Sequence, residues 1–186
     1  MSDIISQDIE RVLISEEEIE TRCKQLAAEI EKDYDDRQIR PIVVGLLKGS
    51  VPFMAELIKY FTHPIEIDFI SVSSYQGTQS GGDVKIDKDM DLSSQGKNVL
   101  IVEDIVDTGR TLAEVRKLFY NKGAQDVKIV ALLDKPDRRV VDIQADYVGF
   151  TVPNEFVVGY GLDFNQRYRN LPYIGVLKSE IYEQYC

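Results

Sequence analysis

The sequence predicts an α/β protein whose core is a doubly wound, mostly parallel β-sheet with a small C-terminal hood. Between residues 41 and 133, short apolar runs rich in β-branched residues alternate with helix-length segments, which is the pattern of a parallel sheet. The last third, residues 147–177, has short strands and many aromatic residues but too little chain for a second domain. We expect one domain over residues 1–186, with its core at about 35–150. The N-terminal segment and residues 151–178 would form the hood.

Composition excludes several classes of protein. The 186 residues are 44% hydrophobic and 29% charged, an ordinary mixture for a globular domain. A formal net charge of -10 argues against a general nucleic-acid surface, which needs clustered Lys and Arg. The longest apolar runs have the length of strands, and the acidic N-terminus differs from a signal peptide. We expect a cytoplasmic protein that binds neither nucleic acid nor membrane.

Cysteine and histidine are too few to suggest a zinc site or a disulfide framework. Cys23 and Cys186 form no C-x-x-C motif and no cluster with His63, the one histidine. His63 precedes a proline at the start of a predicted strand, far along the chain from the acidic residues discussed below. We therefore interpret it as part of a turn and not as a catalytic base.

The first predicted elements are a helix and a buried strand. Ser15 and Glu18 have the spacing of a capping box, so a helix begins there. Its apolar residues recur every three or four positions and define one buried face: Ile19, Cys23, Leu26, Ala27, Ile30 and Tyr34. A strand at 41–47 leads into the turn at Lys48 and Gly49, and a helical segment follows at about 51–60. Such a cationic glycine turn suggests an anion site, although this signal alone is weak.

Two further strands flank the middle of the chain. The first covers residues 65–73 and is followed by a polar, glycine-rich stretch at 74–83 with the composition of a mobile loop. The second covers residues 127–133 and ends at Asp134, Lys135 and Pro136.

The stretch at residues 98–112 carries the strongest functional signal. A buried strand at 99–102 ends in two adjacent carboxylates, Glu103 and Asp104. A turn of small residues follows and leads into a helix at 112–120 that Gly123 ends. The turn offers backbone N–H groups and hydroxyls at a helix N-terminus, which suits a phosphate, while the paired acids suit ribose hydroxyls or Mg²⁺. A phosphorylated sugar would satisfy both, whereas a solvated surface turn is the plain alternative. The chain has no Walker motif and no G-x-G-x-x-G after a strand.

Residues 102–109 resemble the phosphoribosyl-diphosphate (PRPP) signature of type I phosphoribosyltransferases, in the form found in hypoxanthine-guanine phosphoribosyltransferases. Residues 46–49 resemble the family's pyrophosphate loop, in which the peptide before the lysine, here Leu47–Lys48, is often cis. Ser74 and Tyr75 match the tip of its flexible loop. Residues 156–163 resemble its purine-binding segment, and Arg169 matches its pyrophosphate-binding arginine. The resemblance covers about residues 41–178, in the right order.

This resemblance implies purine salvage. Hypoxanthine or guanine would react with PRPP to give IMP or GMP and pyrophosphate, with Mg²⁺ as cofactor, in a homodimer or homotetramer. Asp107 would be the general base. The 5′-phosphate would be bound by Asp107, Thr108, Gly109, Arg110 and Thr111. Pyrophosphate would be bound by Lys48, Gly49 and Arg169. The purine would be bound by Lys135, Phe156, Val157 and Asp163. The metal would be held by Glu103, Asp104 and Asp163.

Two other functions keep parts of this pattern. A regulatory protein with the same fold could bind RNA or DNA, but it would need a basic face or an added segment. An enzyme for adenine or a pyrimidine would keep the signature and lack Lys135 and the segment at Phe156 and Val157. Arg110 stands where some relatives have lysine, and both side chains are cationic.

Overall fold

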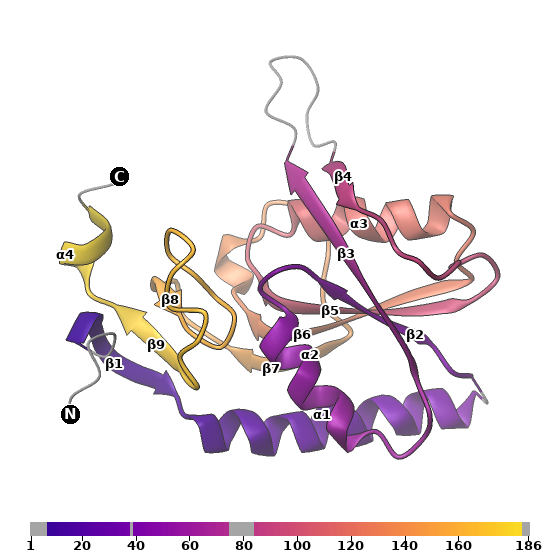
Figure 1. The fold of residues 1–186 in the computed structure, drawn as a ribbon, viewed down its shortest axis with the longest axis horizontal. Helices are drawn as coiled ribbons and strands as arrows, with labels where there is room; N and C mark the ends of the chain where they lie inside the picture. The colour runs from indigo at the N-terminus through magenta and orange to yellow at the C-terminus, as the bar shows by residue number, and fades with distance from the viewer. Residues whose placement is uncertain (1–6, 38, 75–83, 184–186) are drawn as a thin grey trace.

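The computed structural model describes residues 7–37, 39–74 and 84–183 and places their strands in two sheets (Figure 1). The larger sheet has six strands in the order β4-β3-β2-β5-β6-β7. They are β2 (Ile42–Leu46), β3 (Glu66–Ser74), β4 (Val84–Lys88), β5 (Asn98–Val106), β6 (Asp126–Asp134) and β7 (Tyr147–Thr151). All neighbours pair in parallel except β4, which is antiparallel to β3. The predicted doubly wound, mostly parallel sheet is confirmed.

Helices cover both faces of this sheet. Helix α1 (Glu16–Asp36) and helix α2 (Val51–Leu57), which continues as the 3-10 turn η2 (Ile58–Tyr60), pack in one apolar cluster with strand residues. Helix α3 (Arg110–Asn121) packs in a second cluster on the other face. The capping box at Ser15 and the six predicted buried residues of α1 are confirmed. Helix α1 thus contributes to the core beneath the large sheet. Among the described residues, no helix is both long enough and apolar enough to cross a membrane.

The smaller sheet joins the two ends of the chain. Strands β1 (Ile9–Ile14), β9 (Ile174–Leu177) and β8 (Val157–Val158) pair antiparallel in the order β1-β9-β8. The short helix α4 (Ser179–Tyr182) follows, and the 3-10 turn η3 (Pro136–Arg138) comes directly after β6. Figure 1 shows this sheet and α4 beside the larger sheet. We interpret the smaller sheet as the hood of a single domain.

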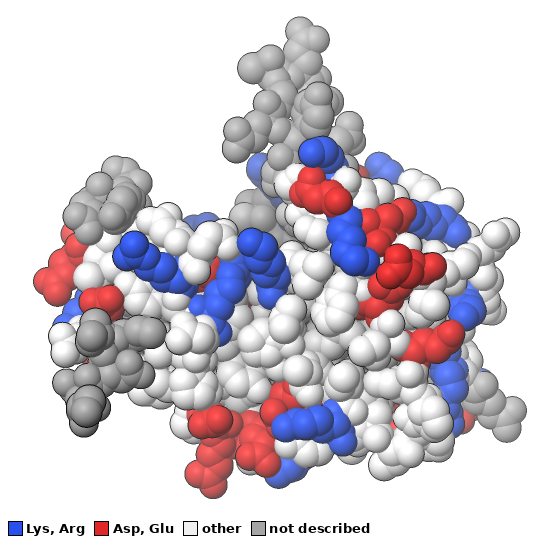
Figure 2. Space-filling model, in the orientation of Figure 1, with Lys and Arg blue, Asp and Glu red and all other residues white. Residues whose placement is uncertain are grey.

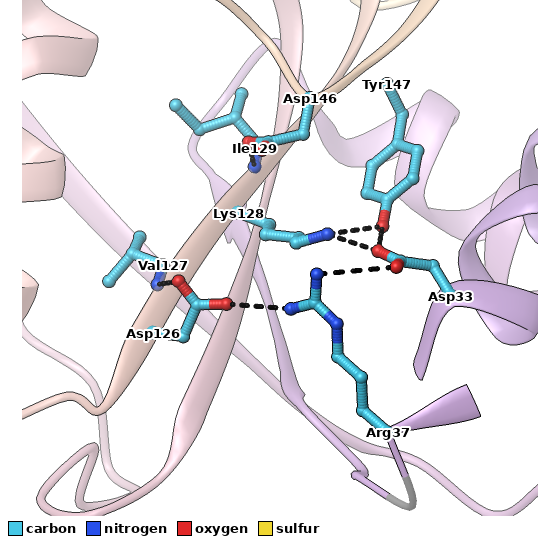
Figure 3. Close-up of polar contacts among 8 residues, drawn as sticks. All are labelled: Asp33, Arg37, Asp126, Val127, Lys128, Ile129, Asp146 and Tyr147. Atoms are coloured by element: carbon cyan, nitrogen blue, oxygen red, sulfur yellow. Dashed lines mark hydrogen bonds and ion pairs between the residues drawn. The ribbon is translucent and has the colours of Figure 1, made fainter. Parts of the chain in front are cut away.

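A polar network fastens α1 to the beginning of β6 and to β7 (Figure 3). The Asp33 carboxylate accepts hydrogen bonds from the Lys128 ammonium and the Tyr147 hydroxyl. Arg37 lies 3.5 Å from Asp33 and 3.4 Å from Asp126. Two hydrogen bonds lower the pKa of Asp33 below its usual range. The bond from Lys128 has the larger effect, and the bond from Tyr147 has the second largest. The network therefore stabilises the folded protein near the start of β6. This is the end of the parallel strands opposite to the one that carries Glu103 and Asp104.

Two predicted boundaries differ from the structure. Strand β5 does not end at the paired acids but continues through them to Val106, because Glu103 pairs with Ala131 of β6. The helical segment predicted to reach residue 60 changes from α to 3-10 geometry after Leu57. Strands β1 and β4 were not predicted as strands, because each is defined by pairing with a partner strand and has few buried residues of its own.

Candidate active site

The turn between β5 and α3 forms a small cavity at the helix N-terminus. Gly109 has φ +81, a left-handed conformation, and a Cβ at this position would collide with Ile143. The cavity has a volume of about 110 Å³, and four of the five predicted phosphate residues line it: Asp107, Thr108, Gly109 and Thr111. Arg110 is exposed as the first residue of α3. Backbone N–H groups at such a position bind anions, so the cavity suits a phosphate group.

The paired acids lie beside this cavity, within the last residues of β5. Glu103 lines the cavity, and its Oε1 accepts a hydrogen bond of 3.1 Å from the backbone N of Asp104. The pKa of the Glu103 carboxyl is raised well above its usual range, first by burial and second by the adjacent Asp104 carboxylate. A buried carboxyl group whose charge is disfavoured by a neighbouring carboxylate fits a bound cation, which would relieve that repulsion.

The turn after β2 lies directly against Asp104. Leu47–Lys48 is a cis peptide, as expected. Gly49 lies against Asp104. A Cβ at Gly49 would overlap the Asp104 carboxylate, and a Cβ at Gly161 would overlap the carbonyl oxygen of Gly49. Three segments that are distant in sequence therefore meet here: the turn after β2, the end of β5 and the hood. Neither glycine has room for a side chain.

The two predicted pyrophosphate cations converge on a residue that sequence analysis missed. The side-chain oxygen of Gln166 accepts from Lys48 Nζ at 3.4 Å and from Arg169 Nη2 at 3.3 Å. Arg169 also pairs with Asp163 at 2.8 Å and donates to the carbonyl of Gly161 at 2.6 Å. Figure 2 shows Lys and Arg side chains gathered over the hood near β8 and acidic ones at the start of α1. A basic site thus exists in an acidic protein.

A larger cavity of about 370 Å³ adjoins the turn. All four predicted purine residues line it: Lys135, Phe156, Val157 and Asp163. Lys135 is only 7% exposed, and its Nζ donates to the backbone carbonyl of Glu155 at 2.6 Å. Burial lowers the pKa of this ammonium. The Phe156 ring stacks on Tyr182 of α4, with ring centroids 4.7 Å apart. The cavity therefore combines an aromatic face with one buried cation.

Asp107 lines both cavities and is held by two arginines that sequence analysis did not single out. Arg138 Nε lies 2.8 Å from Asp107 Oδ1, and Arg139 Nη1 donates to the Asp107 carbonyl at 3.0 Å. Arg139 also pairs with Asp134 at the end of β6. Their position in sequence could have indicated them. They come three and four residues after Lys135, in the turn that follows β6, and β6 ends beside the end of β5.

The structure brings together most predicted site residues, with two exceptions. Ser74 is the last residue of β3, and Tyr75 lies outside the described residues, so the flexible-loop prediction stays untested. The three acids predicted to hold metal do not form a protein-only site, because the described part of the chain contains no group of three or more suitable side chains. Asp163 is instead engaged by Arg169 and by the backbone N of Gln166.

A phosphate-sized turn, paired acids and a base-sized cavity at the carboxyl ends of parallel strands are the features of a phosphoribosyltransferase. The profile of the phosphoribosyl transferase domain family matches residues 13–165. The chain is 55% identical over 181 residues to the hypoxanthine-guanine phosphoribosyltransferase of Bacillus subtilis strain 168, covering 97% of this chain and 99% of that protein. It is 52% identical over 182 residues to that of Streptococcus pyogenes, covering 97% and 100%.

Solved structures agree with this assignment. A hypoxanthine phosphoribosyltransferase from Staphylococcus aureus superposes with a TM-score of 0.91 at 50% identity, covering 98% of each chain. A hypoxanthine phosphoribosyl transferase from Trypanosoma cruzi gives a TM-score of 0.90 at 41% identity, covering 96% of each chain. This chain belongs to the hypoxanthine-guanine phosphoribosyltransferase family, whose members are purine salvage enzymes with the type I phosphoribosyltransferase fold.

Proposed function

We propose that this enzyme transfers the 5-phosphoribosyl group of PRPP to hypoxanthine or guanine, giving IMP or GMP and pyrophosphate. The observation that carries this proposal is the position of Asp107, which lines both the phosphate-sized cavity and the base-sized cavity. A nucleoside 5′-monophosphate has its phosphate and its base at opposite ends of the ribose. The two cavities can therefore accept the two ends of one product molecule.

The turn and the paired acids orient the sugar. Backbone N–H groups and hydroxyls at residues 108–111 bind the 5′-phosphate, which fixes the anomeric carbon relative to the base. Glu103 and Asp104 bind the ribose hydroxyls. These two acids, with Asp163 as a third candidate, would hold Mg²⁺. When bound, Mg²⁺ neutralises negative charge on the pyrophosphate. Lys48, the backbone at Gly49 and Arg169 donate to the same leaving group.

Asp107 is the general base that removes the N7 proton of the purine while N9 attacks the anomeric carbon. Its carboxylate lies between the phosphate-sized cavity and the base-sized cavity, where a proton acceptor is needed. Release from Arg138 would free the Oδ1 atom, which that arginine contacts at 2.8 Å. The proton is thus accepted without leaving the site.

Lys135 selects the 6-oxo purines. An ammonium has donors and no acceptor, so it favours a 6-oxo group and disfavours the donor face of a 6-amino group. Phe156 stacks on the purine ring, and the backbone carbonyls of Val157 and Asp163 accept ring and amino protons. These groups admit both hypoxanthine and guanine.

Three further parts of the proposal come from the resemblance. Ser74, at the end of β3, and Tyr75, which lies outside the described residues, would help to exclude water from the sugar during transfer. The enzyme works as a homodimer or homotetramer in the cytoplasm. It binds neither nucleic acid nor membrane.

A spectrophotometric assay with PRPP, Mg²⁺ and single bases tests the proposed reaction. We expect turnover with hypoxanthine and guanine that EDTA abolishes and excess Mg²⁺ restores. Adenine should react at least about a hundredfold more slowly, because its 6-amino group offers the buried ammonium no acceptor. Equal kcat/KM for adenine and hypoxanthine would contradict the assignment of the base.

A further inference from the structure

Two contacts of Glu155 connect the N-terminal strand to the base cavity. The backbone carbonyl of Glu155 accepts a hydrogen bond from Lys135 Nζ at 2.6 Å. Its carboxylate accepts from Arg11 of β1, whose Nη2 lies 2.6 Å from each of the two oxygens. Arg11 and Lys135 are 124 positions apart in sequence. We call these three residues the Arg11–Glu155–Lys135 chain.

The segment that contains Glu155 lies outside both sheets. It covers residues 152–156, between β7 and β8, and it has no helical or strand structure. Its ends are fixed by backbone hydrogen bonds, from Val152 N to the Asp134 carbonyl and from Leu177 N to the Phe156 carbonyl. Between these ends, the side chain of Glu155 offers an additional attachment to β1. The position of the Glu155 carbonyl can therefore depend on that attachment.

Strand register places Arg11 beside the purine-binding segment. Arg11 pairs with Val176 of β9, and Val176 pairs on its other side with Val157 of β8. The three residues thus form one row across the hood sheet. Because β9 fixes this register, Arg11 contacts the segment at Glu155, two residues before Val157, and Glu155 lines the base cavity.

We propose that Arg11 is a positioning residue for base recognition, which acts through Glu155 to orient the ammonium group of Lys135. This inference rests on the proposed role of Lys135 in reading the 6-oxo group. An ammonium rotates freely and has three donors, so an acceptor fixed at one of them directs the other two. The Glu155 carbonyl is such an acceptor, and Arg11 holds the residue that carries it.

The plain alternative is an exposed ion pair without function. The side chains of Arg11 and Glu155 are 45% and 31% exposed, and pairs of this kind usually contribute little to stability. The protein has a matched control pair, Arg40 and Asp35. These residues also pair at 2.6 Å, and their side chains are 46% and 42% exposed. That pair lies at the other end of α1, outside the base cavity.

The test compares Arg11→Ala, Glu155→Gln and Arg11→Lys with Arg40→Ala in steady-state kinetics. We expect Arg11→Ala to raise the KM for hypoxanthine about three- to tenfold, the range of one hydrogen bond, and to increase the relative kcat/KM for adenine. The KM for PRPP should change less than about twofold. Arg11→Lys keeps the charge and should recover part of the effect. Combining Arg11→Ala with Glu155→Gln should cost no more than the larger single effect, since both break the same contact.

Lys135→Gln, measured in parallel, separates this inference from the proposed function. If Lys135→Gln alters base discrimination while Arg11→Ala behaves like Arg40→Ala, the positioning role is wrong and the reading of the base by Lys135 stands. If Lys135→Gln leaves discrimination unchanged, both are wrong. Equal increases in KM for hypoxanthine and PRPP with Arg11→Ala, or a fall in melting temperature that Arg11→Lys does not reverse, would show a general effect on the hood and overturn the inference.

Discussion

Asp107 combines two constraints that few side chains could meet together. Its backbone carbonyl is part of the turn between β5 and α3 and is held by Arg139, while its carboxylate lines the base cavity and is held by Arg138. The turn thus gives the same residue a structural role through its backbone and, in our proposal, a chemical role through its side chain. Substitutions that keep the size of the side chain separate these roles.

Asp107→Asn should keep the fold and PRPP binding but lose most of the forward rate. The amide has nearly the same shape and leaves the backbone contact to Arg139 in place, but it cannot accept a proton. We expect kcat with hypoxanthine to fall at least about a hundredfold, the usual contribution of a general base. Calorimetric titration with Mg-PRPP should give an affinity close to that of the wild type. Near wild-type turnover across neutral pH would contradict the general-base role.

Lys135→Gln should relax discrimination between bases. An amide can turn either a donor or an acceptor toward position 6. The 6-amino group of adenine, which is a donor, can therefore find an acceptor in the variant. A misplaced hydrogen bond costs roughly 1 to 3 kcal/mol, so the ratio of kcat/KM for adenine to that for hypoxanthine should rise about tenfold or more. Equal losses for all bases would indicate that the lysine serves only the structure.

Segments between the regular elements bring the site together more than the elements themselves do. The turn after β2 reaches Asp104 because Gly49 has no side chain, and the hood reaches that turn because Gly161 has none. Strand β5 supplies the acids and β6 ends at Asp134, so the large sheet fixes one side of the site. The other side depends on these close contacts between loops.

Gly49→Ala should therefore damage sugar and pyrophosphate binding. The added methyl group overlaps the Asp104 carboxylate, so either the turn or the acid must move. We expect Mg-PRPP affinity, measured by calorimetry, to fall at least about tenfold, the effect of losing one charge-assisted hydrogen bond. Gly96→Ala is the control, because a Cβ there meets no atom within 4 Å, although φ +69 makes that substitution locally strained. Equal PRPP affinities for the two variants would refute the close-approach argument.

The α1 network predicts a pH-dependent loss of stability that leaves kinetics intact. Asp33→Asn removes a carboxylate whose pKa is lowered in the folded state by Lys128 and Tyr147. A lowered folded-state pKa gives stability that is full above the unfolded value of about 3.9 and is lost as pH falls through the folded value. Denaturation midpoints of wild type and variant should therefore differ at pH 7 and approach each other below about pH 4.

Asp35→Asn on the same helix is the control for this measurement, because Asp35 pairs with the exposed Arg40. It should shift the midpoint less than Asp33→Asn, and neither variant should change kcat/KM for hypoxanthine. A gap between wild type and Asp33→Asn that widens on acidification would contradict the assigned direction of the pKa.

Local signals predicted most of the fold of this molecule, and pairing between distant segments accounts for what was missed. The buried face of α1, the strands at β2, β5 and β6 and the glycine that ends α3 are visible in sequence because each depends on its own residues. Strand β1 is different, since only its pairing with β9 at the far end of the chain makes it a strand. Strand β4 likewise depends on pairing with β3.

The same distinction applies to the site. The signature turn was predicted from its own residues, because it follows a buried strand, and Lys135 was predicted from the family resemblance. Gln166, Arg138 and Arg139 were missed because their importance comes from what they contact across the fold. Gln166 also has a positive φ of 64, a conformation that its residue type does not suggest. Positions of this kind can be found only when the hood and the sheet are seen together.

A crystal structure of the enzyme with bound IMP is the decisive measurement. Our proposal predicts that the 5′-phosphate lies in the turn at residues 108–111 and that the purine stacks on Phe156. The O6 atom should lie within hydrogen-bond distance of Lys135 Nζ, about 2.7 to 3.2 Å. A phosphate bound elsewhere, or a lysine ammonium remote from position 6, would contradict it.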